Sequence, residues 1–221
     1  MTAMKNKLAV TIWNYKGGVG KTTISLILSE IAAQRGLKVA AIDLDEQRNL
    51  SETLKFTSSN FPNIDIRTSF NQQIANEDYD FYVLDTHPTK GGTIVEALEF
   101  ADIILIPILG DFLSVLNLRS AIDYVMTLDV EAWRVAIVKN CMTGLKVSEE
   151  VENLLDRNAY SIAGRLPRNN ILIKNIASGE SWDKFMRPYQ REPFMQLYRQ
   201  LWSVNKKIAV GNVNNLWGER D

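Results

Sequence analysis

The chain has 221 residues, 46% of them hydrophobic, with a formal net charge of −1 and a pI near 6.0. That apolar content is enough for one sizeable core, so we expect a single domain over residues 1–221. The near-zero charge excludes a basic field over the whole molecule, although it leaves room for a local basic patch.

The composition excludes two further classes of protein. Cys141 is the only cysteine, which excludes an internal disulfide and a cysteine-based metal site; we expect it to pack as a small apolar side chain. There is no run of about 18 apolar residues, so we expect neither a transmembrane helix nor a membrane partner. The first apolar run, Leu8–Trp13, is too short for the core of a signal peptide. A cytoplasmic location follows as an expectation.

Short apolar runs alternate with longer amphipathic stretches along the chain. The apolar runs, each predicted to be a strand, are Leu8–Trp13, Val39–Asp43, Phe81–Asp85, Ile103–Ile108 and Val135–Val138, with a shorter strand near Ile64–Ile66. The stretches with helical spacing are Thr22–Arg35, Asn49–Phe56, Thr93–Phe100, Leu113–Leu128, Ser148–Asp156 and Asn170–Ser178. Continuous apolar strands are typical of parallel sheets buried on both faces. The order predicts an α/β fold with a doubly wound, mostly parallel sheet flanked by helices.

The end of the chain is less regular. Pro188 and Pro193 precede a longer amphipathic helix that we predict over Phe194–Ile208. The tail from about residue 210 to 221 is rich in Asn and Gly, and we expect it to be flexible.

The segment Asn14–Thr23 reads NYKGGVGKTT and joins the first predicted strand to the first predicted helix. Glycines in such a turn let backbone N–H groups close on an anion, and the helix N-terminus adds positive potential. Lys21 suits the β- and γ-phosphates of a nucleotide, and the Thr22 hydroxyl suits Mg²⁺. These features predict a phosphate-binding loop and a P-loop NTPase fold.

The strict pattern G-x-x-x-x-G-K-[ST] fails, because Tyr15 occupies the position of the first glycine. An additional lysine, Lys16, follows it. This residue is either a solvated surface lysine or a charge that serves a phosphate bound elsewhere, for example across a dimer interface.

The run K-G-G-x-G-K-[ST]-[ST] resembles the deviant Walker A box of the ParA/MinD superfamily. The resemblance implies that Lys16 reaches the nucleotide of a partner subunit in an ATP-bound sandwich dimer and acts in catalysis together with Lys21. It also implies that the rest of the loop binds the nucleotide; these residues are Gly17, Gly18, Val19, Gly20, Lys21, Thr22 and Thr23.

Two predicted strands end in carboxylates. Asp43 and Asp45 follow one strand and Asp85 ends another, and strands of an open α/β sheet bring their carboxyl ends to one crevice. The first run resembles the I-D-x-D-P-Q motif of the superfamily, with Glu46 in place of the proline. The resemblance implies that Asp45 orients the attacking water and that Asp43 supports Mg²⁺ through its water shell. An apolar strand that ends in Asp85 matches a Walker B acid, a ligand of Mg²⁺ or of its water.

The histidine after Asp85 departs from the D-T/S-P-P of the superfamily, because the chain reads Asp85-Thr86-His87-Pro88. His87 either senses nucleotide, relays a proton or makes an ordinary polar contact. This variant resembles the branch that includes the ATPase assisting T-DNA transfer.

Contacts to the base are implied by resemblance alone. Asn140 ends a strand as in relatives with a polar residue near adenine, and Pro167 belongs to a segment that resembles their I-P-R-N run. A polar loop that caps a helix is the alternative.

Basic residues cluster late in the chain among aromatic ones; they are Arg187, Arg191, Arg199, Lys206 and Lys207. They either hold DNA phosphates without reading sequence, or they form the solvated face of an amphipathic helix.

Taken together, the resemblance implies a ParA-like ATPase that uses ATP and Mg²⁺, forms a homodimer and binds nonspecific DNA near the nucleoid. It also implies a small centromere-binding or adaptor protein that stimulates hydrolysis during plasmid or chromosome partition. Three alternatives stay open: an ATPase that positions another cargo or a conjugative DNA-transfer complex, a P-loop metabolic enzyme of the dethiobiotin synthase type, and a non-catalytic ATP-dependent binding module.

Overall fold

The computed structural model describes residues 7–57, 61–142, 153, 155, 160–213 and 216–217. Within these residues the strands form one seven-stranded sheet in the order β3-β2-β4-β1-β5-β6-β7. Every neighbouring pair is parallel. The strands are β1 (Leu8–Ile12), β2 (Val39–Asp43), β3 (Ile64–Arg67), β4 (Phe81–Asp85), β5 (Ile103–Ile108), β6 (Val135–Met142) and β7 (Ile162–Pro167). The predicted doubly wound parallel sheet is confirmed.

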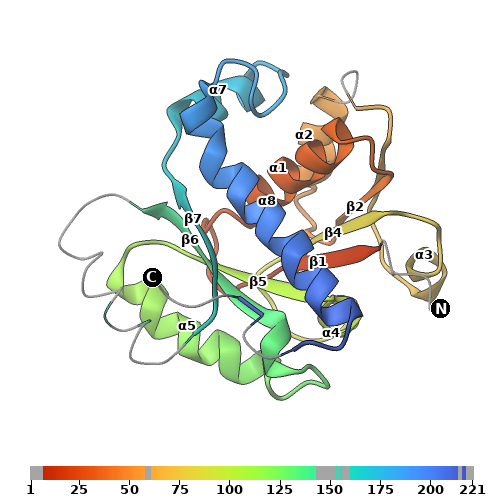
Figure 1. Cartoon of the computed structure of the whole chain (residues 1–221), viewed down its shortest axis with the longest axis vertical. Coiled ribbons are helices and arrows are strands. Elements are labelled where there is room, and N and C mark those ends of the chain that lie inside the picture. Colours follow the sequence, from red (N-terminus) through yellow and green to blue (C-terminus); the bar gives the residue numbers. More distant parts are fainter. Residues whose placement is uncertain are drawn as a thin grey trace.

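Helices cover both faces of the sheet (Figure 1). They are α1 (Lys21–Gln34), α2 (Asn49–Thr57), α3 (Gln72–Ala75), α4 (Thr93–Phe100), α5 (Phe112–Val125), α7 (Asn170–Ala177) and α8 (Pro188–Ala209), with a short 3₁₀ turn, η2, at Ala132–Arg134. One core cluster joins α1 and α8 to alternate residues of β1, such as Leu8 and Val10. A second joins α4 and α5 to the opposite face of β5 and β6.

The central strands are apolar throughout because both of their faces are covered. All residues of β1, β2, β4 and β5 are buried. This explains why these four strands read as continuous apolar runs rather than alternating ones. β3, at the sheet edge, is only half-buried.

The last helix starts earlier than the sequence indicates. Helix α8 begins at Pro188 and continues through Pro193 to Ala209, so the predicted start at Phe194 is wrong. A proline at the first helical position loses no hydrogen bond, because the N–H there has no helical partner. Pro193 lies further inside, where the missing N–H leaves one carbonyl of the first turn without its helical donor.

Other boundaries also differ from the prediction. β6 extends to Met142 and carries an irregular register near its end. The apolar pattern of the sequence did not predict β7 or the single-turn helix α3. Cys141, in the extension of β6, has φ 52° and is exposed, so the packing role predicted for it is wrong. The predicted helix Ser148–Asp156 lies outside the described residues except for residues 153 and 155, which are helical.

Part of the tail packs on the body of the molecule. Leu216 is buried, and its carbonyl accepts a hydrogen bond from Lys207 Nζ at 3.0 Å. Trp217 Nε1 donates to the Trp133 carbonyl at 3.0 Å. Among the described residues no helix has the length and apolar character required to cross a bilayer.

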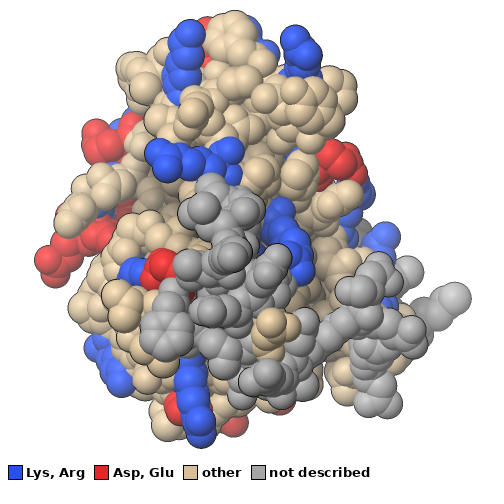
Figure 2. Space-filling view, turned by 90° about the vertical axis from the view of Figure 1, so that its left-hand side faces the viewer, with Lys and Arg blue, Asp and Glu red and all other residues tan. Residues whose placement is uncertain are grey.

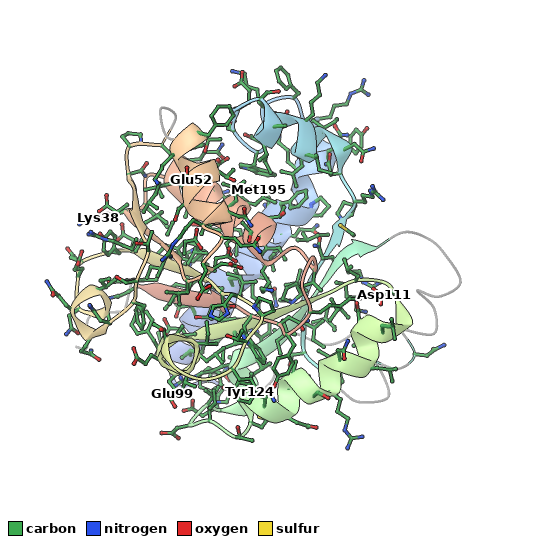
Figure 3. All side chains as sticks on the ribbon, turned by 180° about the vertical axis from the view of Figure 1, so that it is seen from behind. Lys38, Glu52, Glu99, Asp111, Tyr124 and Met195 are labelled. Atoms are coloured by element: carbon green, nitrogen blue, oxygen red, sulfur yellow. The ribbon has the colours of Figure 1, made fainter. Side chains whose placement is uncertain are left out.

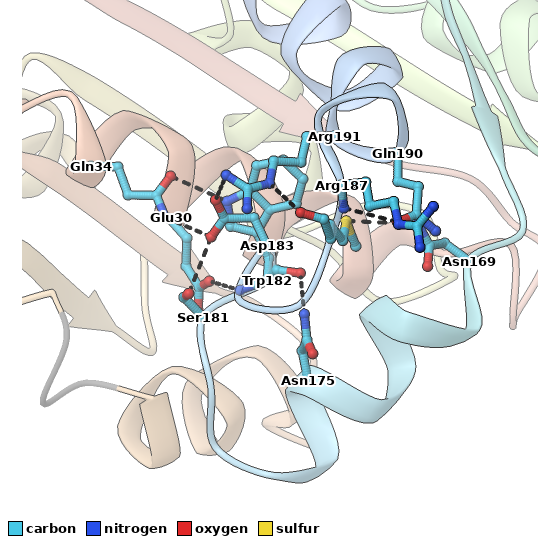
Figure 4. A network of polar contacts seen from close by, with 11 residues as sticks. Glu30, Gln34, Asn169, Asn175, Ser181, Trp182, Asp183, Arg187, Gln190 and Arg191 are labelled. Atoms are coloured by element: carbon cyan, nitrogen blue, oxygen red, sulfur yellow. Dashed lines mark hydrogen bonds and ion pairs between the residues drawn. The ribbon is translucent and has the colours of Figure 1, made fainter.

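A polar network ties α1 to the segment between α7 and α8 (Figure 4). Glu30 is fully buried; its carboxylate accepts hydrogen bonds from the Trp182 N–H at 2.7 Å and from the Thr57 hydroxyl at 3.0 Å. Asp183 accepts from Gln34 and forms an ion pair with Arg191 at 3.2 Å. The helix that begins at the glycine-rich loop is therefore braced by the C-terminal part of the chain.

Candidate functional site

The glycine-rich loop joins β1 to the N-terminus of α1 at the carboxyl edge of the sheet. Gly18 and Gly20 have φ of 72° and 94°, a region that residues with a Cβ rarely adopt. Position 20 has no room for a side chain, because a Cβ there would lie 2.1 Å from Nδ2 of Asn140. Gly17 and Gly18 are exposed and Val19 is buried, so the loop is anchored by its valine and leaves its glycines open.

Asn140 holds this loop from the end of β6. Its Nδ2 donates to the Val19 carbonyl at 2.8 Å, and the side chain is almost fully buried. The sequence indicated an adenine contact for Asn140, but not this brace of the loop backbone. The base contact itself stays a prediction.

A cavity of about 560 Å³ opens beside the loop, within the size range of small-molecule sites. The loop supplies Gly18, Gly20 and Thr23, and the ends of β6 and β7 supply Asn140 and Pro167. Apolar side chains of α1, α7 and α8 complete the wall; they include Ile24, Ile27, Leu172 and Phe194. Three residues of the phosphate loop and the two predicted base-contact residues therefore line one cavity together with apolar side chains.

Lys21 is folded back over the loop. The residue is 7% exposed, and its Nζ donates to the carbonyls of Asn14 and Lys16, each at 3.3 Å. Burial lowers the pKa of Lys21, whereas the charges of Asp85 and Asp45 act to raise it. The ammonium is thus held among the loop carbonyls and close to the acids at the strand ends.

Asp43 and Asp85 face each other in register on neighbouring strands β2 and β4. Burial raises the pKa of Asp85 to about 7; the neighbouring Thr22 and Ser25 hydroxyls act against the shift, and the charge of Asp43 adds to it. Ser25 Oγ donates to Asp85 Oδ1 at 3.1 Å, while Oδ2 is buried without a hydrogen-bond partner.

The unpartnered Asp85 oxygen fits a site for Mg²⁺. A buried carboxylate oxygen without a donor is costly, and Mg²⁺ takes oxygen ligands, among them carboxylates, hydroxyls and waters. Thr22 lies beside Asp85, at the start of α1. These two residues would hold the ion or its waters next to the phosphate loop.

Both carboxylate oxygens of Asp43 accept hydrogen bonds from backbone N–H groups. One of its oxygens accepts from the Asp45 N–H at 3.1 Å, and the other accepts from the Ser51 N–H at 2.8 Å in the first turn of α2. This carboxylate therefore fixes the turn after β2 and the start of α2. Its predicted contact with the water shell of Mg²⁺ stays a prediction.

Asp45 lies half-buried on that same turn, where its Oδ1 accepts from the Gln47 N–H at 2.9 Å. The turn has Glu46 in place of the proline of the I-D-x-D-P-Q motif. Arg48 supplies part of the rigidity that a proline would give this turn. Arg48 has φ 55°, and its guanidinium donates to the carbonyls of Asp43 and, at 2.9 Å, of Thr68. The sequence pattern did not indicate this role for Arg48.

Lys16 points to the start of α5. Its Nζ lies 2.9 Å from both carboxylate oxygens of Asp111 and 2.8 Å from the Ser114 hydroxyl. Asp111 also caps α5 through the Ser114 N–H at 2.9 Å. Partial burial acts to raise the pKa of Asp111, but the hydrogen bonds of Lys16 and Ser114 outweigh it and lower the pKa.

His87 is half-buried in the loop after β4, and its Nδ1 lies 2.7 Å from the Thr89 hydroxyl. This is a contact within the loop. Its part in nucleotide sensing stays a prediction.

A glycine-rich loop at the carboxyl edge of a parallel sheet, with a buried lysine and an unsatisfied aspartate beside it, defines a nucleotide-binding protein of the P-loop class. Residues 10–182 match the family model "CobQ/CobB/MinD/ParA nucleotide binding domain". The chain belongs to this family of nucleotide-binding proteins.

The chain also matches curated proteins. The chain is 32% identical to the protein IncC of Escherichia coli in an alignment of 142 positions; the match covers 43% of this chain and 39% of IncC. It spans less than two thirds of the length of the curated relatives that it matches.

Solved structures share the fold at low identity. A Borrelia burgdorferi B31 protein described as a plasmid partition protein, bound to AMPPNP, is 18% identical with a TM-score of 0.72; the match covers 89% of this chain and 98% of that one. The septum site-determining protein MinD of Pyrococcus horikoshii, complexed with Mg-ADP, is 16% identical with a TM-score of 0.70, over 88% and 96% of the two chains.

Proposed function

We propose that the chain is a ParA-like ATPase that binds ATP and Mg²⁺, forms a sandwich dimer, binds nonspecific DNA and drives plasmid or chromosome partition. One observation carries the proposal: Lys21, Thr22 and the unpartnered oxygen of Asp85 lie together beside the glycine-rich loop, and Gly18, Gly20 and Thr23 of that loop line the cavity. The nucleotides bound in the two solved structures, AMPPNP and Mg-ADP, support the choice of ligand.

Hydrolysis requires little covalent chemistry from the protein, so positioning and charge dominate. The loop N–H groups and Lys21 hold the phosphates, and Lys21 neutralises charge that builds up in the transition state. Asp45, on the turn after β2, orients the attacking water. Bound Mg²⁺ would supply a further positive charge on the phosphate oxygens. We expect slow turnover that a small centromere-binding or adaptor protein stimulates.

Dimerisation is proposed to recruit Lys16. In the single chain the contacts with Asp111 and Ser114 satisfy its ammonium. The phosphates of a partner's nucleotide carry more negative charge than one carboxylate, so they can compete for Lys16 when two ATP-bound chains meet face to face.

The basic cluster expected at the C-terminus is largely used within the chain. Arg191 pairs with Asp183, Arg199 pairs with Glu192, and Lys207 donates to the Leu216 carbonyl. On the face that Figure 2 shows, Lys and Arg side chains are scattered rather than gathered into one continuous patch.

A groove between α8 and the turn that follows α1 is the better candidate for DNA. It has a volume of about 550 Å³, and its lining includes Arg35, Lys206, Tyr198 and Trp202, with Asp80 as its one acidic residue. The Arg35 guanidinium lies 5.4 Å from the ring centroid of Tyr198. Cations beside aromatic faces suit a phosphate backbone that is bound without reading sequence.

The first experiment is ATP turnover, together with retention of plasmid DNA in the presence of ATP. We expect Asp45→Ala to lose turnover and to keep ATP binding. We expect the double variant Arg35→Glu/Lys206→Glu to lose retention, while Arg119→Glu, which alters an exposed arginine of α5, keeps it. Turnover that survives in Asp45→Ala would contradict the catalytic assignment.

The second candidate is an ATPase that positions another cargo or a conjugative DNA-transfer complex. The fold shared with MinD favours keeping it. An ATP-dependent dimer that retains no DNA at low salt would support this candidate over partition.

A further inference from the structure

The loop over residues 86–92, which follows Asp85, is attached to the phosphate loop by an aromatic cluster. Trp13, Tyr15 and Tyr124 form this cluster, with ring centroids 4.7 Å apart for Trp13–Tyr15, 5.3 Å for Trp13–Tyr124 and 5.9 Å for Tyr15–Tyr124. Tyr15 immediately precedes Lys16, and Tyr124 lies in the last turn of α5. Tyr15, which occupies the position of the first glycine of a P-loop, therefore packs in this aromatic cluster.

Lys90 lies over two of these rings. Its Nζ is 4.5 Å from the ring centroid of Tyr15 and 4.8 Å from that of Tyr124, both within the range of cation–π attraction. Two hydrogen bonds fix the neighbouring backbone: Trp13 Nε1 donates to the Thr89 carbonyl at 3.1 Å, and the Gly91 N–H donates to the Tyr124 hydroxyl at 3.0 Å.

Two glycines end the loop next to this attachment. Gly91 and Gly92 both have positive φ, 84° and 53°, and they lead into α4. Because glycines resist backbone rotation least, the contacts of Lys90 and Thr89 set where the loop lies.

Consecutive residues of the phosphate loop thus hold both ends of α5. Lys16 contacts Asp111 and Ser114 at the beginning of the helix, and Tyr15 contacts Tyr124 near its end. Figure 3 shows Asp111 and Tyr124 at opposite ends of α5.

We propose that Lys90 is a positioning residue: its contact with Tyr15 and Tyr124 fixes the loop 86–92 against the phosphate loop in the arrangement that supports hydrolysis. This inference rests on the proposed ATPase function. No described residue of the loop 86–92 is among those that line the cavity. Loss of the contact should therefore lower the turnover number more than the affinity for ATP.

Three variants separate charge from packing. Lys90→Met keeps the length of the apolar stem and removes the charge, whereas Lys90→Arg keeps a cation that can stack on the rings. Lys38→Met is the matched control, because Lys38 Nζ lies 4.6 Å from the ring centroid of Tyr79, on the amino-terminal side of the sheet.

Two measurements decide the outcome: steady-state ATP hydrolysis with ATP affinity, and hydrogen–deuterium exchange of residues 86–92 in the nucleotide-free protein. We expect Lys90→Met to lower the turnover number by about two- to tenfold, with ATP affinity changed by less than about twofold. Exchange in the loop should be faster. Lys90→Arg should restore both values, and Lys38→Met should change neither.

The inference would be overturned if residues 86–92 of Lys90→Met exchanged as slowly as those of the wild type. It would also be overturned if Lys90→Arg lowered the turnover number as much as Lys90→Met does. A loss of ATP affinity that accounts for the whole effect would also overturn it. If the wild type itself does not hydrolyse ATP, the proposed function fails, and loop exchange still decides whether Lys90 fixes the loop.

Discussion

Lys16 Nζ lies 2.9 Å from both carboxylate oxygens of Asp111, and the two side chains are 27% and 43% exposed. The lysine that the sequence singles out is therefore held within its own chain. A pair this exposed contributes only about 0–1 kcal/mol, so a better anionic partner can displace Asp111. The contact with Asp111 therefore holds Lys16 only weakly within its own chain.

Asp111→Asn should favour ATP-dependent dimerisation. Asparagine can still cap α5, but it lacks the charge that holds Lys16. We expect the dimer to form at an ATP-bound protein concentration that is up to about thirtyfold lower, because each dimer would otherwise break two pairs of up to about 1 kcal/mol each. Sedimentation of the ATP-bound protein measures this. Asp123→Asn on the same helix is the control, and a weaker dimer in Asp111→Asn would contradict the prediction.

Gly20→Ala should abolish nucleotide binding. The new methyl group would lie 2.1 Å from Asn140 Nδ2, at a φ of 94° that alanine avoids. We expect a destabilisation of about 1–3 kcal/mol from the backbone strain alone. Adding Asn140→Ala relieves the clash but not the strain, so the double variant should regain part of the stability and little of the binding. Calorimetry with an ATP analogue tests both, and full recovery of binding would show that space alone requires glycine.

Asp85→Asn should separate stability from function. The substitution removes a buried carboxylate whose pKa is raised to about 7, so the nucleotide-free variant should melt at or above the wild-type temperature at pH 8. A gain of 1 kcal/mol corresponds to about 2–4 °C at this chain length. The stabilisation that Mg²⁺ and ATP add together should disappear. A thermal shift by Mg²⁺ and ATP equal to that of the wild type would remove Asp85 from the metal site.

Glu30 should make stability depend on pH. Burial raises its pKa from 4.5 to about 7; hydrogen bonds from Trp182 and Thr57 act against the shift, and the charge of Asp183 adds to it. The folded chain then binds a proton more tightly than the unfolded chain does, so stability is lost as the pH rises from about 4.5 to 7. Glu30→Gln should remove roughly 1–3 kcal/mol of that loss.

Thermal melting at pH 5 and at pH 8 tests this prediction. The melting temperature of Glu30→Gln minus that of the wild type should be higher at pH 8 than at pH 5. Glu52→Gln, an exposed residue of α2, is the control. An identical difference between Glu30→Gln and wild type at both pH values would contradict the role of Glu30.

The sequence predicted the fold because the buried strands leave a simple signal. Apolar runs at β1, β2, β4 and β5 follow directly from a sheet that is covered on both faces. The start of α8 could not be predicted in this way, because prolines at its first turns are typical of a loop as well as of a helix beginning.

The candidate site was predictable where a motif fixes it and not where tertiary contacts do. The glycine-rich loop carries its own spacing, so the sequence alone places Lys21 and Thr22 at the start of α1. The brace from Asn140 to Val19 and the contacts of Arg48 and Lys90 join residues distant in sequence, and no local pattern encodes them. Asp111 falls in the same group, because only the fold brings it to Lys16.

The proposed sandwich dimer is tested most directly by the molecular mass of the ATP-bound protein. Light scattering should be measured for Asp45→Ala, in which slowed hydrolysis retains ATP, and for Asp45→Ala with Lys16→Ala. We expect the first to reach twice the 25.1 kDa of one chain and the second to stay at one chain while it still binds ATP. An ATP-dependent dimer of equal strength in both proteins would contradict a role for Lys16 across the interface.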